Sequence, residues 1–332
     1  MTTVKDIGEQ GLLKKLQSFC PPEIIGDDAA VLVTAPGKSL VVTTDVLIDG
    51  VHFSDATTSP EDAGWRAAAA NLSDLAAMGA SPVGITVGLG LPGDLQVSWV
   101  ERLYQGMTEC LQKYHTPIVG GDVVRSPTAT ISITAFGEVD PQRVIRRSAA
   151  KVGMAIVVTG VHGASHAGLE LLLHPQLGQN LSPAEKTPLI KAHQRPQPRL
   201  DVLPILWEIV TPPFPVAGMD SSDGLADAVL QICRASNVGA VIDSQKIPVP
   251  GTFTNWLKPE QAIEYALYGG EDFELVLCLP STQANTLVQQ LSLGAAIIGT
   301  ITSGSQVLLR DQSQKNPDQV LSLSQGFQHF GQ

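Results

Sequence analysis

The chain has 332 residues, of which 43% are apolar and 16% are charged, a length that favours two domains and a composition typical of globular proteins. Its net charge of −11 argues against a surface built to bind nucleic acid or an anionic membrane. No uncharged apolar run approaches the roughly 20 residues that span a bilayer, and the N-terminus lacks the basic and apolar regions of a secretory signal.

The four cysteines are far apart in the sequence, and no two of them have CxxC spacing. This pattern indicates neither a zinc knuckle nor a disulfide framework. We therefore expect reduced thiols in a cytoplasmic protein.

In the first half of the chain, apolar periodicity and turn residues predict an alternation of helices and strands. A capping Ser and a Pro mark the start of the second helix at Ser59-Pro60. The expected helices span 4–20, about 59–78 and 94–114, and the expected strands span 29–34, 39–47, 83–91, 117–120 and 129–138.

A polar, basic segment at 143–153 favours a domain boundary, giving domains at 1–145 and 150–332. The second half again alternates, which predicts an α/β or α+β layered fold. We expect strands at 155–159, 238–243 and 273–279 and helices at 166–174, 200–209, 224–236 and 260–267. Over 175–198, five prolines predict a loop with at most one helical turn.

Aspartates recur in short turns beside glycine, hydroxyl or small apolar residues. Any one of them could be a helix cap or a turn residue, but adjacent carboxylates repel each other unless a cation joins them. Clusters of aspartate and hydroxyl oxygens suit Mg²⁺. The turns are Gly26-Asp27-Asp28, Thr43-Thr44-Asp45, Asn71-Leu72-Ser73-Asp74, Gly120-Gly121-Asp122 and Asp220-Ser221-Ser222-Asp223.

Other segments resemble nucleotide or anion motifs less well. Gly37-Lys38-Ser39 lacks the first glycine of a P-loop, because position 32 is Leu, and the GxGxxG match at 88–93 contains Pro92. Gly163-Ala164-Ser165 precedes a predicted helix, so it could bind an anion at the helix N-terminus or simply begin a helix.

The five acidic turns, His52 and the segment Gly269-Gly270-Glu271-Asp272-Phe273-Glu274-Leu275 follow one another in an order that resembles the thiamine-monophosphate kinase family. That family is related to aminoimidazole ribonucleotide synthetase, to hydrogenase maturation protein and to selenide, water dikinase. The resemblance covers nearly the whole chain. It implies a two-domain α/β fold whose N-terminal sheets pair across a homodimer.

The resemblance also implies roles for individual residues. The implied metal ligands are Asp28, Thr43, Thr44, Asp45, Asp74, Asp122, Asp220 and Asp223, of which Asp45, Asp122 and Asp220 would be central to catalysis. The implied ATP contacts are Tyr104, Gly121, Asp122, Arg147 and Ser222, and the implied substrate contacts are His52, Glu271 and Phe327. Arg147 is preferred to Arg146 because it begins Arg-Ser-Ala-Ala-Lys-Val-Gly, which departs from the family pattern Arg-Ser-Gly-Ala-Lys-Pro-Gly at Ala149 and Val152.

The implied reaction transfers the γ-phosphoryl group of ATP to thiamine monophosphate, with several Mg²⁺ ions. Because the acceptor phosphate is largely deprotonated near neutral pH, the transfer needs no general base and would proceed in line, without a phosphoenzyme. The alternatives are another ATP-dependent enzyme of the superfamily, aminoimidazole ribonucleotide synthetase above all, or a non-catalytic metal- and nucleotide-binding protein.

Overall fold

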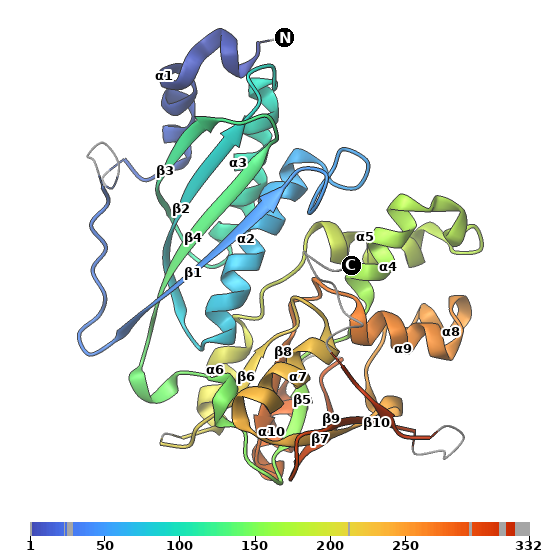
Figure 1. Cartoon of the computed structure of the whole chain (residues 1–332). Coiled ribbons are helices and arrows are strands. Elements are labelled where there is room, and N and C mark those ends of the chain that lie inside the picture. The colour runs from blue at the N-terminus through green and yellow to red at the C-terminus, as the bar shows by residue number, and fades with distance from the viewer. Residues whose placement is uncertain are drawn as a thin grey trace. The chain divides into compact units, whose positions relative to one another are not determined.

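The computed structural model describes residues 2–22, 24, 29–211, 213–291, 294–311 and 317–322 (Figure 1). The predicted ligand Asp28 and the predicted substrate contact Phe327 lie outside these residues. The chain forms two compact units, one of Met1–Leu75 with Ala80–Pro141 and one of Ala76–Gly79 with Gln142–Gln332.

The first unit combines three α-helices with a four-stranded sheet. Its elements are α1 (Val4–Leu16), the short 3-10 helix η1 (Gln17–Phe19), β1 (Ser39–Ile48), α2 (Pro60–Ala77), β2 (Ser81–Leu91), α3 (Val97–Gln112), β3 (Ile118–Arg125) and β4 (Thr130–Val139). The predicted start of α2 is confirmed, since Ser59 Oγ accepts the Asp62 N–H at 3.2 Å.

The strand predicted over 29–34 is wrong. The structure shows no strand within 29–38, and Val31 and Val33 are 87% and 83% exposed. In Figure 1 this segment runs extended beside the sheet without joining it. Alternating apolar residues form a strand only where a neighbouring strand supplies hydrogen bonds, and the described part of this segment has no such neighbour.

The sheet has the order β1-β4-β2-β3, and only the β2–β3 pair is parallel. Figure 1 shows α2 and α3 on one face. Side chains alternate along β4, so that Ile131, Ile133 and Ala135 are buried towards these helices. The helices pack closely: a Cβ on Gly64 of α2 would lie 1.9 Å from Leu103 O of α3.

The second unit has a seven-stranded sheet of order β11-β10-β7-β9-β5-β8-β6, in which only β7 and β10 pair in parallel among the described strands. Its strands are β5 (Ala155–Val158), β6 (Ala217–Asp220), β7 (Gly239–Asp243), β8 (Leu275–Leu279), β9 (Ala296–Thr302), β10 (Val307–Arg310) and β11 (Gln319–Val320). Its α-helices are α4 (Ala164–Leu173), α5 (Pro183–Gln194), α6 (Val202–Ile209), α7 (Leu225–Ser236), α8 (Phe253–Trp256), α9 (Pro259–Tyr268) and α10 (Ser281–Gln290). Short 3-10 helices are η2 (Pro141–Arg143), η3 (Arg147–Ala149), η4 (Pro175–Gly178) and η5 (Ser244–Lys246).

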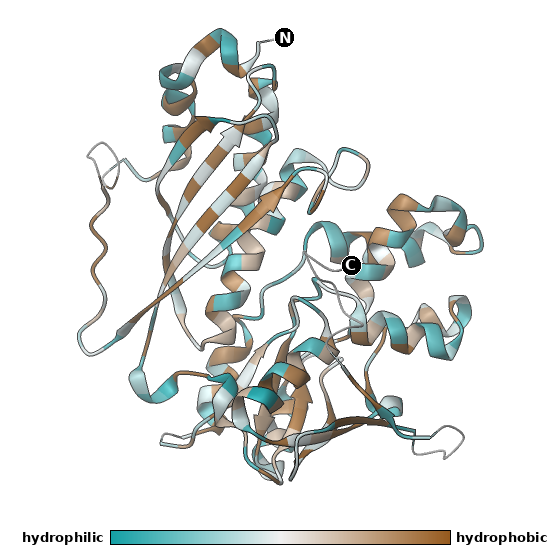
Figure 2. Cartoon of the chain, viewed as in Figure 1, coloured by the Kyte–Doolittle hydropathy of each residue, from teal (hydrophilic) through white to brown (hydrophobic). Residues whose placement is uncertain are grey.

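The core of this unit lies on the central strands, where every residue of β5 and β8 is buried. Figure 2 shows the hydrophobic colour concentrated there. The layered α+β class predicted from the alternation is thus found in both units. No helix among the described residues is both long and apolar enough to cross a membrane.

The loop predicted over 175–198 is wrong, because α5 occupies its centre. The helix begins with a capping box, in which Ser182 Oγ and the Glu185 carboxylate exchange hydrogen bonds with each other's backbone. Pro183 stands in the first turn, where proline is tolerated. The motif Ser-Pro-Ala-Glu was visible in the sequence, but the density of prolines outweighed it in the prediction.

Candidate functional site

In the first unit, β1 and α2 bring a hydroxyl and a carboxylate together. Thr43 Oγ1 donates a hydrogen bond to Asp74 Oδ2. Asp45 is two residues further along β1 and therefore lies on the same, helix-covered face of the sheet. Both Asp45 and Asp74 are half-buried. One face of β1 thus presents hydroxyl and carboxylate oxygens, the donors that Mg²⁺ prefers.

The other two predicted ligands of this unit lie on the opposite face. Thr44 alternates with Thr43, and its Oγ1 lies 2.9 Å from Thr134 Oγ1 across the strand pair. Asp122 pairs with Gly88, and Gly88 pairs with Ser132 of β4, which places Asp122 on the same open face as Thr44. Asp122 is exposed. The predicted ligands of the first unit therefore divide between two faces of one sheet.

A cavity of about 240 Å³ opens between α1, α3 and the edge strand β3. Three of the predicted ATP contacts line it: Tyr104, Gly121 and Asp122. Cys20 and the segment that includes Ala29 close its other side. The cavity combines an aromatic wall with exposed backbone and one carboxylate, a mixture typical of small-molecule sites.

Tyr104 forms the apolar wall of this cavity. Its ring centroid lies 5.4 Å from that of Phe19, at an interplanar angle of 51°. Burial raises the pKa of the Tyr104 hydroxyl above its ordinary range. The side chain is therefore neutral and suited to packing against a planar group.

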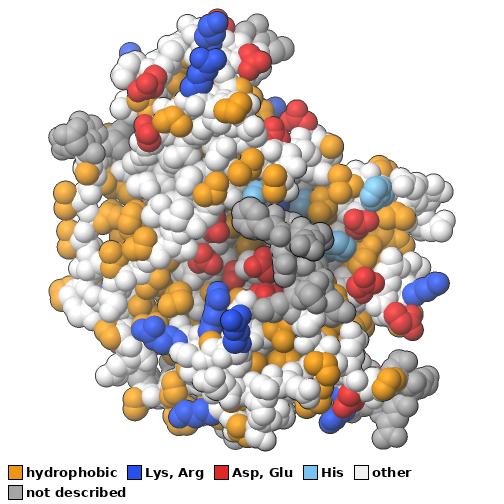
Figure 3. All heavy atoms as spheres, viewed as in Figure 1, with side chains coloured by type: hydrophobic (Ala, Val, Ile, Leu, Met, Phe, Trp, Pro, Cys, Tyr) orange, Lys and Arg blue, Asp and Glu red, His pale blue; other side chains and the backbone are white. Residues whose placement is uncertain are grey.

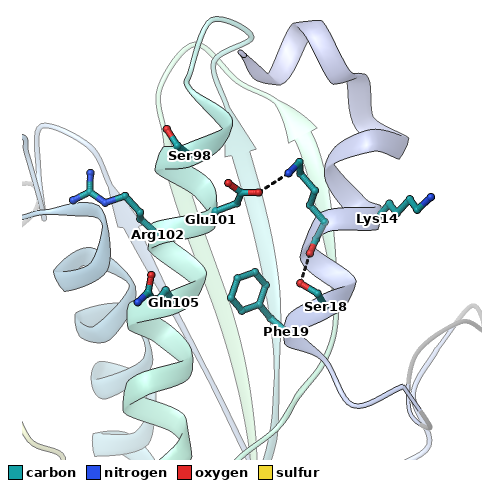
Figure 4. Close-up of a pocket in the computed structure, with 8 residues that line it drawn as sticks. Lys14, Ser18, Phe19, Ser98, Glu101, Arg102 and Gln105 are labelled. Atoms are coloured by element: carbon teal, nitrogen blue, oxygen red, sulfur yellow. Dashed lines mark hydrogen bonds and ion pairs between the residues drawn. The ribbon is translucent and has the colours of Figure 1, made fainter. Parts of the chain in front are cut away.

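A second, open groove runs on the other side of Phe19, between α1 and α3 (Figure 4). Three of the charged groups that line it, Lys15, Glu101 and Arg102, are paired within the protein. Lys15 Nζ lies 2.6 Å from Glu101 Oε1, and Arg102 binds Glu61 through two hydrogen bonds of 2.6 and 2.8 Å. None of the predicted site residues lines this groove.

His52 follows β1 in a turn. The Nδ1 atom of His52 accepts the backbone N–H of Ile48 at 3.1 Å. The backbone N–H of His52 donates to the carbonyl oxygen of Ile48 at 2.9 Å. With Nδ1 acting as an acceptor, the neutral ring carries its proton on Nε2. The turn thus fixes the ring and leaves Nε2–H as the donor.

In the second unit, the acidic turn follows β6. Asp220 is 3% exposed, and its Oδ1 accepts the Ser222 hydroxyl at 3.1 Å. Ser221 is fully buried, and its Oγ lies 3.1 Å from Nε2 of His162. Gly224 has φ +102°, a conformation that favours glycine, and it leads directly into α7. Hydrogen bonds fix Asp220, Ser221, Ser222 and Gly224 of this turn, whereas Asp223 is exposed.

The N-terminus of α7 carries a further carboxylate that the sequence reasoning did not single out. Burial and the charge of Asp223 raise the pKa of Asp227, whereas the charge of Arg147 lowers it. The 3-10 helix η3, which begins with Arg147, packs against α7, and Ser236 Oγ of α7 donates to Arg147 O at 2.8 Å. The sequence feature that could have pointed to Asp227 is its position four residues after Asp223, about one helical turn further along.

Glu271 lies in a loop before β8 with φ +66°. Its N–H donates to Ser222 O at 2.7 Å, and its Oε2 lies 3.6 Å from His193 Nδ1. Two predicted site residues, Ser222 and Glu271, thus adjoin within this unit.

The possible anion site at the start of α4 is occupied by the chain itself. Asp272 Oδ2 accepts the Gly163 N–H at 2.6 Å and Oδ1 accepts the Ser165 N–H at 2.9 Å. Nearby, Arg199 pairs with the carboxylate of Glu274, which also accepts the Thr159 hydroxyl at 2.5 Å. Sequence reasoning assigned no role to Asp272, His162 or Arg199.

The donor chemistry fits Mg²⁺, since all the predicted ligands offer oxygen. Within the described residues, however, no three His, Cys, Asp or Glu side chains gather closely enough to hold a metal ion by themselves. Of the predicted ligands, Thr43, Asp45 and Asp74 lie in the first unit, and Asp220 and Asp223 lie in the second.

Comparisons with known proteins match both units. The N-terminal domain of the AIR synthase related proteins matches residues 26–139, and their C-terminal domain matches residues 151–311. The thiamine-monophosphate kinase of Synechococcus elongatus is 53% identical over 330 residues, covering 99% of this chain and 98% of that protein.

Two solved structures agree. Thiamine-monophosphate kinase from Stenotrophomonas maltophilia K279a superposes with a TM-score of 0.79 at 32% identity, covering 90% of this chain and 95% of that one. AaThiL complexed with AMPPCP and TMP superposes with a TM-score of 0.74 at 33% identity, covering 96% and 99%. The chain belongs to the thiamine-monophosphate kinase family, within the AIR synthase related proteins.

Proposed function

We propose that this protein phosphorylates thiamine monophosphate with ATP, yielding thiamine diphosphate and ADP. One observation carries the proposal: the cavity of the first unit gathers Tyr104, Gly121 and Asp122, three residues assigned to ATP from the sequence alone. The 53% identity to a thiamine-monophosphate kinase over the full chain supports the same activity.

The nucleotide base would pack against Tyr104, whose neutral, apolar ring suits a planar partner. Gly121 would line the nucleotide site with its backbone, while its missing Cβ makes room for Val87 O of β2, from which a Cβ would lie only 2.1 Å. Arg147 and Ser222, which both belong to the second unit, would contact phosphate oxygens. Arg147 is exposed and carries the only kind of side chain that binds phosphate through two parallel hydrogen bonds.

Thiamine monophosphate would bind near His52 and Glu271. His52 offers a fixed Nε2–H to the phosphate. Glu271 offers a carboxylate, one-third exposed, to the thiazolium charge or the aminopyrimidine. Phe327, outside the described residues, would add an aromatic face to the cationic ring.

Thr43, Asp45 and Asp74 would hold Mg²⁺ on the helix-covered face of the first unit's sheet, and Thr44 and Asp122 would offer oxygen on its open face. Asp220 and Asp223 would hold Mg²⁺ in the second unit, and the predicted ligand Asp28 lies outside the described residues. The metal ions would supply neutralisation of charge on the two phosphorylated substrates. The residues assigned to the two substrates would orient the acceptor oxygen in line with the γ-phosphate. Because that oxygen is already ionised near pH 7, no side chain needs to remove a proton.

The open face of the first unit's sheet supports a homodimer. Leu40, Val42 and Val46 of β1 and Val124 of β3 are each 44% exposed or more, and Figure 3 shows hydrophobic side chains over this sheet. Leu40, Val42 and Val46 form an exposed apolar row along the edge strand β1, and exposed apolar surface of this kind marks interaction sites. All four cysteines are free, which agrees with a cytoplasmic protein.

The test is ADP release from ATP and Mg²⁺ with and without thiamine monophosphate, with thiamine diphosphate quantified in parallel. We expect equal amounts of both products, and no ADP without the acceptor. ADP release that is independent of thiamine monophosphate, or no release by folded protein, would contradict the proposal.

A further inference from the structure

The carboxylate of Asp272 is seated on the N-terminus of α4. It accepts the backbone N–H groups of Gly163 at 2.6 Å and Ser165 at 2.9 Å. These N–H groups have no partner within the helix, and the helix dipole favours a negative charge there. Asp272 thus links the loop before β8 to the N-terminus of α4.

The loop that Asp272 anchors is strained on both sides of it. Glu271 has φ +66° and Phe273 has φ +53°. Non-glycine residues in this region cost about 1 kcal/mol or more each, so the conformation persists only if its surroundings hold it. Of these residues, Asp272 is the one whose side chain accepts two backbone N–H groups at a helix start, whereas the Glu271 carboxylate lies 3.6 Å from His193 of α5.

The segment before α4, which includes His162 and Gly163, also supports the loop that carries Asp220 and Ser222. Nδ1 of His162 lies 3.2 Å from Gly160 O, while Nε2 lies 3.1 Å from Ser221 Oγ. The two supported loops are joined directly, since Glu271 N–H donates to Ser222 O at 2.7 Å. One turn therefore fixes both the residue assigned to the thiamine substrate and the residues assigned to ATP and metal.

We propose that Asp272 is a positioning residue for phosphoryl transfer. Its carboxylate, seated on the N-terminus of α4, holds Glu271 in the left-handed backbone conformation that presents the Glu271 carboxylate to thiamine monophosphate. This inference rests on the proposed function and deepens it. It assigns Asp272 no contact with either substrate.

The test is Asp272→Asn, which keeps the shape but replaces one acceptor oxygen with a donor nitrogen. We expect the KM for thiamine monophosphate to rise at least ~10-fold, with the KM for ATP within about threefold of wild type, because His162 still supports the Ser221 turn. Glu185→Gln is the matched control. It weakens another acidic cap, in the α5 capping box, and should leave both KM values unchanged.

A merely structural role would lower the melting temperature and the yield of active protein while leaving both KM values alone, and that result overturns the proposal. If Asp272→Asn does not fold, Asp272→Glu keeps the charge but displaces the loop, and should show the same selective KM change. If neither folds, hydrogen exchange of wild type decides. The Gly163 and Ser165 amides should gain protection when thiamine monophosphate is added without ATP, and unchanged protection overturns the proposal. A wild type without any thiamine diphosphate formation would instead refute the proposed function.

Discussion

The hydroxyl of Thr43 donates a hydrogen bond to the carboxylate of Asp74, joining β1 to α2 at the point where both present oxygen atoms. Asp74 stands near the C-terminal end of α2, where the helix dipole disfavours an anion. A hydroxyl donor relieves only part of that cost, and a bound cation would relieve more. We therefore expect Asp74→Asn to lower kcat at least ~100-fold, with Thr43→Val costing less because the carboxylate remains.

The measurement is kcat at saturating ATP, thiamine monophosphate and Mg²⁺, with circular dichroism to confirm the fold. Asp94→Asn, which alters an exposed acid in the turn before α3, should retain wild-type activity. A kcat for Asp74→Asn within threefold of wild type would remove this residue from the metal site.

The two glycines before Asp122 make a matched pair on β3. A Cβ on Gly121 would lie 2.1 Å from Val87 O, whereas a Cβ on Gly120 would meet nothing closer than Thr86 Cγ2 at 3.7 Å. Backbone cannot yield as a side chain does, so Gly121→Ala should destabilise the protein by about 2 kcal/mol and weaken ATP binding. Gly120→Ala should be nearly neutral.

Urea denaturation and nucleotide titration of both variants check this expectation. Both variants add one methyl group at adjacent positions of the same strand. A difference between their stabilities therefore reflects the local contacts of that methyl group. Equal stability of the two variants would show that β2 and β3 separate at no cost, against the close approach of Gly121 to Val87.

Burial lowers the pKa of His162 to about 4, and the Gly160 carbonyl opposes this shift only in part. In the unfolded chain the pKa is about 6.5, so between these values the unfolded state binds more protons than the folded state. The stabilisation is therefore present above about pH 6.5 and is lost as the pH falls towards 4, by on the order of 3 kcal/mol.

Comparing wild type with His162→Asn isolates this contribution, because Asp272 and Glu274 have raised pKa values and act in the opposite direction in both proteins. The difference in unfolding free energy between the two should shrink steadily between pH 7 and pH 4.5. His174→Asn changes an exposed histidine and should give a difference that does not vary in this way. A constant difference for His162→Asn would contradict the burial of a neutral ring.

The regular elements with clear end signals could be predicted from the sequence. Ser59-Pro60 gave the start of α2 to within a residue, because capping is a local property. The failures are those in which distant contacts decide. Alternation at 29–34 predicts a strand only if a sheet edge accepts it, and the α5 capping box had to compete with three prolines inside or beside the helix.

For the site, the acidic turns could be found because metal sites need many oxygens, whereas the supports of those turns could not. His162 is 59 residues from Ser221, and Asp272 is 107 residues from Ser165. Nothing local marks such pairs. The division of Thr43 and Thr44 between two faces follows from strand alternation alone, and so it was available from the sequence once β1 was assigned.

Finally, the open face of the first unit's sheet predicts an assembly that charge should disrupt. Val42 and Val46 lie on this face, on the edge strand β1, and are 53% and 44% exposed. A two-fold interface places the same patch on both partners, so Val42→Lys with Val46→Lys would bury like charges against each other.

Light scattering after gel filtration of this doubly substituted protein should show a change from twice the chain mass to the 35.0 kDa monomer. Val152→Lys, which alters an exposed valine of the second unit, should leave the mass unchanged. Because Asp122 shares the open face, the monomeric variant should also lose activity, and a doubly substituted protein that keeps the wild-type mass would show that this face is not the interface.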